Sequence, residues 1–197
     1  MIKNYICFIF ITVVLPESKL QFCTFCVPVN AEFYGRLIMK EEFYKDGLCF
    51  ECQRCSFCCG HSPGYVYLSQ RDLLALCKFF KMSVKEFVAV HCRWADYYYG
   101  DKVLALLEKK NYDCELWNNG CTAYEARPVQ CSTYPFWSWM IKDRKTWDEC
   151  SKDCPGMNKG RLWTFEEIER NKISYEINRP LKKEEVEKLI EKEEKSL

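Results

Sequence analysis

Cysteines dominate the residues of this chain that could do chemistry. Fifteen are present among 197 residues, and Cys52, Cys55 and Cys58 repeat every third position with Cys59 directly after them. Closely spaced thiols can converge on one metal ion, but they form poor disulfides with each other because a disulfide needs a particular separation and dihedral angle. Because the number of cysteines is odd, a disulfide framework would also leave one cysteine unpaired. We therefore favour metal ligation in a reducing compartment.

Thiolates are soft ligands that suit zinc, iron and iron–sulfur clusters rather than magnesium or calcium. The C-x2-C-x2-C run is similar to the three-cysteine run of bacterial ferredoxins, whose fourth ligand precedes a proline. Here the matching pair, Cys154-Pro155, lies far downstream. In an extended chain, adjacent Cys58 and Cys59 would point to opposite sides. They would then serve two metal centres, or one of them would pack as a small apolar residue.

A second group of ligands must come from the later part of the chain, and eight thiolates are enough for two four-thiolate centres or for one polynuclear site. Thiolates around a divalent ion leave a net negative charge, so Arg54 and Arg127 are candidates for charge compensation. Arg54 can equally be an ordinary surface arginine. The later candidates are Cys114, Cys121, Cys131 and Cys154.

Three segments share the pattern of a known family. Residues 50–64 read FECQRCSFCCGHSPG, residues 121–137 read CTAYEARPVQCSTYPFW, and Cys154 is followed by Pro-Gly. Together they resemble the CxxCxxCC motif, the C-x-x-Y-E-x-R-P-x-x-C motif and the closing C-P-G of the YkgJ-type cysteine-cluster proteins, described as zinc- or iron-chelating domains. The resemblance covers residues 43–160. It implies eight metal-binding cysteines, namely Cys52, Cys55, Cys58, Cys59, Cys114, Cys121, Cys131 and Cys154.

Some features depart from that family. Cys49 and Cys150 lie outside its motifs, and each is either a spare thiol or a substitute ligand. The position after Cys59 is often basic in the family, whereas here it is Gly60. His61 is more readily a loop residue outside the ligand set than a ligand.

The resemblance leaves the biological role open. The leading hypothesis is binding of zinc or iron, for structure, storage or delivery. An iron–sulfur redox protein is one alternative. A related cluster occurs in flagellin lysine N-methylases, so an accessory role in methyl transfer is another, although the radical-SAM spacing C-x3-C-x2-C and a Gly-rich nucleotide loop are absent.

Composition limits the partners. With 29 basic and 28 acidic residues the net charge is +1, so no broad basic surface is indicated and nucleic acid is not expected as a partner. A hydrophobic content of 48% favours a folded domain over a disordered chain. A metal ion is the expected partner, and the sequence indicates no particular protein partner.

The amino terminus allows three interpretations. Residues 5–15, YICFIFITVVL, are apolar but too short to span a bilayer, for which a helix needs about 20 residues. They could be an export signal or membrane anchor within residues 1–20, a buried element, or sequence upstream of a true start at Met39. We favour the last, with residues 1–38 a hydrophobic leader or mis-assigned start, and hence a cytoplasmic protein.

Local patterns predict a small, helix-rich α+β domain with short strands and long loops, stabilised by metal. Ser69, Ser83 and Thr164 each precede an acidic residue by three positions, which predicts three capped helix starts. Strands are expected at 64–68 and 103–107, a turn at 118–120, and a charged helix at 182–195. We expect residues 39–163 to form the cysteine-cluster domain and residues 164–197 a charged helical extension.

Overall fold

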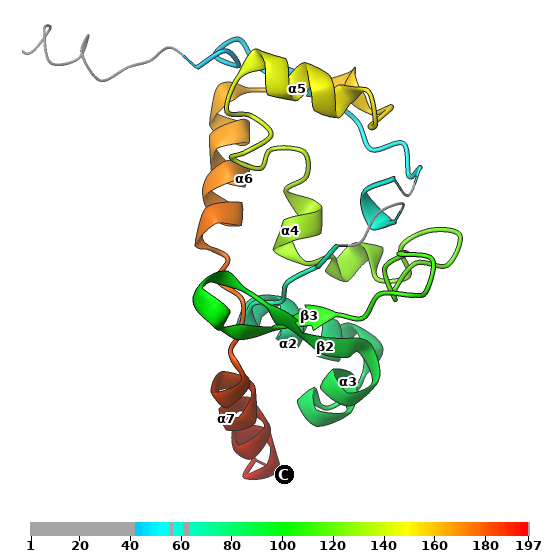
Figure 1. Cartoon of the computed structure of the whole chain (residues 1–197), viewed down its shortest axis with the longest axis vertical. Helices are drawn as coiled ribbons and strands as arrows, with labels where there is room; N and C mark the ends of the chain where they lie inside the picture. Colours follow the sequence, from blue (N-terminus) through cyan, green and yellow to red (C-terminus); the bar gives the residue numbers. More distant parts are fainter. Residues whose placement is uncertain (1–41, 56, 61–63, 197) are drawn as a thin grey trace, which may run out of the picture. The chain divides into compact units, whose positions relative to one another are not determined.

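The computed structural model describes residues 42–55, 57–60 and 64–196. The expected leader (residues 1–38) and His61 lie outside this part. Its elements, in the labels of Figure 1, are β1 (Leu48–Phe50), η1 (Phe57–Cys59), α2 (Gln70–Phe80), α3 (Val84–His91), β2 (Cys92–Asp96), η2 (Tyr98–Gly100), β3 (Lys102–Leu106), η3 (Tyr124–Ala126), α4 (Val129–Ser132), α5 (Arg144–Ser151), β4 (Met157–Trp163), α6 (Phe165–Ile177) and α7 (Lys183–Glu194).

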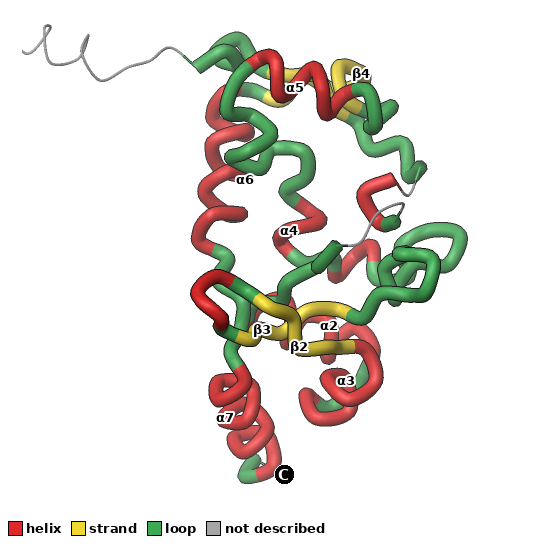
Figure 2. The backbone as a smooth tube through the Cα atoms, in the orientation of Figure 1, coloured by secondary structure: helices red, strands yellow, loops and turns green. Residues whose placement is uncertain are grey.

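The predicted α+β class is confirmed. Helices alternate with two antiparallel two-stranded sheets, β1–β4 and β2–β3 (Figure 2). Strands β1 and β4 lie about a hundred residues apart in the sequence, and the register shifts between Cys49 and Phe50. The pairing of Phe50 with Met157 therefore brings the start of the first cysteine motif beside the closing one.

The three predicted helix starts are confirmed by complete capping boxes. Ser69 caps α2 with Asp72, and Ser83 caps α3 with Glu86 in the same way. Thr164 caps α6, where the Glu167 side chain accepts a hydrogen bond from the backbone of Thr164. In each box the hydroxyl and the carboxylate satisfy backbone N–H groups that the first helical turn leaves without partners, which is why these starts can be read from sequence.

The predicted strand at 103–107 corresponds to β3, but the one at 64–68 is shorter than expected. It is reduced to an isolated bridge between Tyr67 and Ala105, flanked by hydrogen bonds from Leu68 N to Leu104 O and from Leu106 N to Val66 O. The physical reason is that Ser69 already caps α2, so the chain leaves the edge of β3 at once.

Buried apolar residues form two clusters. The first core lies among α2, α3, β3 and α7, and the second lies among β1, α5, β4 and α6. The largest fully buried side chains of the first core include Phe87 and Leu73, and those of the second include Trp147 and Phe136. The cysteine motifs must be placed relative to both cores.

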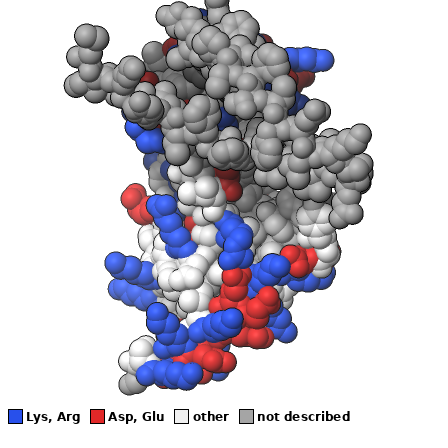
Figure 3. All heavy atoms as spheres, turned by 90° about the vertical axis from the view of Figure 1, so that its left-hand side faces the viewer, with Lys and Arg blue, Asp and Glu red and all other residues white. Residues whose placement is uncertain are grey.

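Residues 164–196 belong to the same compact unit as the cysteine segments. Ile168 is buried in the second core, and Leu181 and Val186 are buried in the first. Helix α7 is charged on its outer side, and Figure 3 shows basic and acidic side chains intermixed over the lower part of that view. Within the described ranges, no helix is long and apolar enough to cross a membrane.

Candidate metal centre

All eight predicted cysteines line one cavity of about 200 Å³, which we call the thiol cavity. They reach it from the loop before η1, from η1 itself, from the segment between β3 and α4, from α4, and from the turn before β4. The other four cysteines of the described chain, Cys49, Cys77, Cys92 and Cys150, do not line it. No disulfide joins any two cysteines in this part of the chain.

Backbone contacts tie the three motifs to each other. The Cys114 N–H donates to the carbonyl of Cys59 at 2.6 Å, which joins the first motif to the second. The Glu51 N–H donates to the carbonyl of Gly156 at 3.1 Å, which joins the first motif to the third. A Cβ added at Gly156 would lie 2.2 Å from the Glu51 carbonyl oxygen, so this close approach requires glycine.

Two arginines share one aromatic ring at the wall of the thiol cavity. The guanidinium carbons of Arg54 and Arg127 lie 4.7 Å and 3.8 Å from the centre of the Tyr124 ring. Arg127 also donates from Nε to the Tyr124 carbonyl at 3.2 Å. Tyr124 thus links the first and second motifs, and cation–π attraction holds both charges at the cavity. No Asp, Glu, Lys or His of the described ranges lines it.

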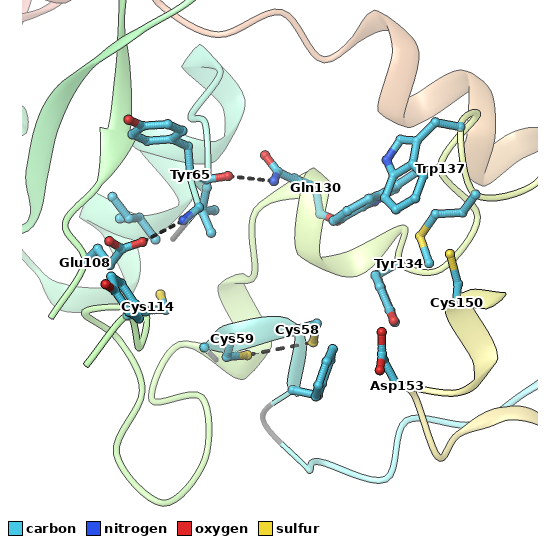
Figure 4. A pocket seen from close by; sticks show the side chains of 18 of the residues that line it. Cys58, Cys59, Tyr65, Glu108, Cys114, Gln130, Tyr134, Trp137, Cys150 and Asp153 are labelled. Atoms are coloured by element: carbon cyan, nitrogen blue, oxygen red, sulfur yellow. Dashed lines mark hydrogen bonds between the residues drawn. The ribbon is translucent and has the colours of Figure 1, made fainter. Parts of the chain in front are cut away.

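Cys58 and Cys59 do not point to opposite sides. That expectation assumed an extended chain, whereas residues Phe57–Cys59 form a tight 3-10 turn and the two sulfurs lie 3.9 Å apart (Figure 4). The hydrogen bond between the two sulfurs and, to a smaller extent, the positive charge of Arg127 lower the pKa of Cys58 to about 7. The same hydrogen bond and burial raise the pKa of Cys59. Cys58 is therefore the thiol of this pair that ionises first.

Deeper in the cavity the thiols favour their neutral form. Burial raises the pKa of Cys131, and the nearby Cys114, Cys58 and Cys121 raise it further. Burial also raises the pKa of Cys114. Because a metal binds thiolate rather than thiol, loading these positions would release protons.

The donor set fits a soft metal, since every candidate ligand at the cavity is sulfur. Within the described ranges, however, no group of three or more Cys, His, Asp or Glu side chains is placed to hold an ion as it stands. A cysteine sulfur is re-aimed by rotation about one bond. Binding by these residues would thus involve changes of cysteine rotamer around the cavity.

The aromatic residues of the cysteine segments divide among three places. Trp117 lines the thiol cavity, and Phe136 is buried in the second core against Trp147. Trp137 and Trp139 line a neighbouring cavity. Sequence reasoning missed Tyr134, which lines both cavities, and its position three residues after Cys131 was the available signal.

The two cysteines outside the family motifs have different surroundings. Cys49 lies in β1 opposite Leu162 and away from the thiol cavity. Cys150 lies on α5 near Cys154 and lines the neighbouring cavity. His91, at the end of α3, stacks on Phe80 beside the first core.

No family model and no solved structure matches this chain. The resemblance to the YkgJ-type proteins thus stays a prediction that rests on the three motifs.

Proposed function

We propose that this protein binds zinc or iron through thiolates of Cys52, Cys55, Cys58, Cys59, Cys114, Cys121, Cys131 and Cys154. The observation that carries the proposal is the thiol cavity. Eight cysteines chosen from sequence motifs line it, and the four other described cysteines do not. Hydrophobic packing alone does not explain why these eight cysteines line the cavity, because Cys77 and Cys92 pack in the first core and do not line it.

The charges around the cavity support the same proposal. Four thiolates on a divalent ion carry a net charge of −2, and a buried anion is costly without compensation. Arg54 and Arg127 supply positive charge at the cavity wall, and carboxylates are absent from its described lining. Apolar neighbours such as Leu116 and Trp117 limit the access of water to metal–sulfur bonds.

Elemental analysis and absorption spectroscopy of the full chain, purified anaerobically, test the proposal. A colourless, air-stable protein with stoichiometric zinc assigns a zinc–thiolate centre. A brown, oxygen-sensitive protein with acid-labile sulfide assigns an iron–sulfur cluster, and with it a redox role. Protein that contains neither metal after anaerobic purification and reconstitution would refute the proposal.

Single substitutions test the ligand set. We expect Cys114→Ser and Cys131→Ser to lose at least one metal equivalent per chain, because serine does not replace a thiolate ligand to a soft metal. Cys49→Ser and Cys92→Ser are the matched controls, since both cysteines are part-buried but lie outside the cavity. If the controls lose as much metal as Cys114→Ser, the assignment of ligands is wrong.

A further inference from the structure

A second cavity, of about 440 Å³, adjoins the thiol cavity (Figure 4). Cys58, Cys59, Cys114 and Tyr134 line both cavities and so form a shared wall. Its volume falls within the range of roughly 300–1,000 Å³ that small-molecule sites occupy. A ligand held here would lie directly beside the candidate metal ligands.

The charged residues that line the second cavity are opposite in sign to those that line the thiol cavity. Its described lining contains the carboxylates of Glu108 and Asp153 and no Lys, Arg or His, whereas the thiol cavity has two arginines and no carboxylate. Aromatic rings make up much of the remaining wall, among them Trp137 and Trp139. Carboxylates combined with ring faces favour a cation that carries apolar groups.

The two carboxylates differ in how far they are already neutralised. Glu108 accepts a hydrogen bond from Gly64 N at 2.8 Å, and its carboxylate lies 3.5 Å from the Arg93 guanidinium. Asp153 forms no side-chain hydrogen bond or salt bridge with any described residue, and Figure 4 shows its carboxylate facing the Tyr134 hydroxyl. Asp153 therefore supplies most of the uncompensated negative charge.

The aromatic wall is held in place before any ligand arrives. The Gln130 side chain donates to the Tyr65 carbonyl at 2.8 Å and accepts from Tyr67 N at 3.1 Å. The Trp137 indole N–H donates to the Gln130 carbonyl at 2.9 Å, and its ring stacks on Tyr175. A pre-ordered wall lowers the entropic cost of binding.

We propose that this second cavity binds a small organic cation, an ammonium with an apolar stem, in contact with the metal–thiolate wall. The inference rests on the proposed function in one respect, because the net negative charge of a loaded thiolate centre adds to the attraction. Asp153 provides the partner for the charge, and Trp137 and Trp139 provide ring faces, with Trp139 at the exposed rim.

Calorimetric titration of the full-length, metal-loaded protein tests this with a matched pair of probes. Choline carries the cationic head, and 3,3-dimethylbutan-1-ol has the same shape without charge. We expect choline to bind and the neutral probe to bind at least about fivefold more weakly. Asp153→Asn and Trp139→Ala should each weaken choline binding about two- to fivefold, because each removes one exposed contact. Asp148→Asn, on α5 but outside the cavity, should bind choline like the wild type.

Metal content is measured on every sample so that the two proposals can fail separately. Full metal loading with no preference for choline over its neutral isostere, or with an unchanged affinity in Asp153→Asn, overturns the cation site and leaves metal binding intact. A chain without metal that still prefers choline overturns the proposed function, and the cavity's own carboxylate and rings then account for binding.

Discussion

Gly156 illustrates how one residue can fix the distance between two cysteine motifs. It lies against the backbone of Glu51, just before Cys52, and it follows Cys154 by two positions. The contact is between main chains, so neither side can move without shifting a strand of the β1–β4 pair. The Pro-Gly of the closing motif thus has a packing reason that does not depend on metal.

A prediction at this scale concerns Gly156→Ala. The added Cβ would meet the Glu51 carbonyl oxygen at 2.2 Å, so we expect a loss of about 1–3 kcal/mol in the free energy of unfolding. Gly60→Ala is the matched control, because the nearest atom there is the end of the Asp113 side chain, which can rotate away. Urea denaturation of both variants measures the difference, and equal stability losses would contradict this account.

At the scale of secondary-structure elements, Asp72 holds three helices in one arrangement. Asp72 is buried, with 3% of its surface exposed, and its side chain caps α2 together with Ser69. One carboxylate oxygen accepts from Val129 N, the first residue of α4, at 2.9 Å. The other accepts from Asn178 Nδ2, at the end of α6, at 2.8 Å. Since α4 carries Cys131, this carboxylate also positions one wall of the thiol cavity.

We expect Asp72→Asn to lower the free energy of unfolding by about 2–4 kcal/mol, because an amide would turn a donor toward groups that are themselves donors. Asn178→Ala removes only one of these hydrogen bonds, at a part-exposed position, and should cost about 1 kcal/mol. Chemical denaturation monitored by circular dichroism compares the two. A cost for Asp72→Asn no greater than that for Asn178→Ala would show that the carboxylate does not organise the three helices.

The sequence was informative where the signal was local. The starts of α2, α3 and α6 follow from hydroxyl and acidic residues three positions apart, and these are interactions within one turn of helix. The pairing of β1 with β4 could not be predicted, because a three-residue strand has no measurable period and its partner lies about a hundred residues away.

The sequence predicted which cysteines line the candidate site, but it did not predict the shape of the site. The motifs selected the eight cysteines that line one cavity, yet they gave no indication of the neighbouring cavity or of Tyr134 in the shared wall. The predicted side-chain directions of Cys58 and Cys59 were wrong because the backbone there forms a tight turn. Side-chain direction depends on backbone angles that residue type alone does not determine.

At the scale of the whole described unit, the thiol cavity lies where the two cores meet. Cys114 and Cys121 pack against the first core, whereas Cys154 is buried in the second. The chain passes from the second core to the first, back to the second and again to the first, so the cavity joins segments far apart in sequence. A metal ion bound to sulfurs from both cores would tie them together, and its binding free energy would add to the stability of the folded chain.

This arrangement predicts that metal removal destabilises the two cores together. A metal bound only by the folded chain stabilises it by about 3 kcal/mol at a hundredfold excess over its dissociation constant, and for a domain of this size that corresponds to about 5–10 °C in Tm. Anaerobic treatment with a strong chelator should lower the Tm by that amount and speed amide exchange around Cys59 and Cys114 more than in the middle of α2. The same treatment of Cys114→Ser, which we expect to hold less metal, should have a smaller effect. An unchanged Tm after complete removal of the metal would mean that hydrogen bonds such as that of Cys114 to Cys59, and not the ion, hold the two cores in place.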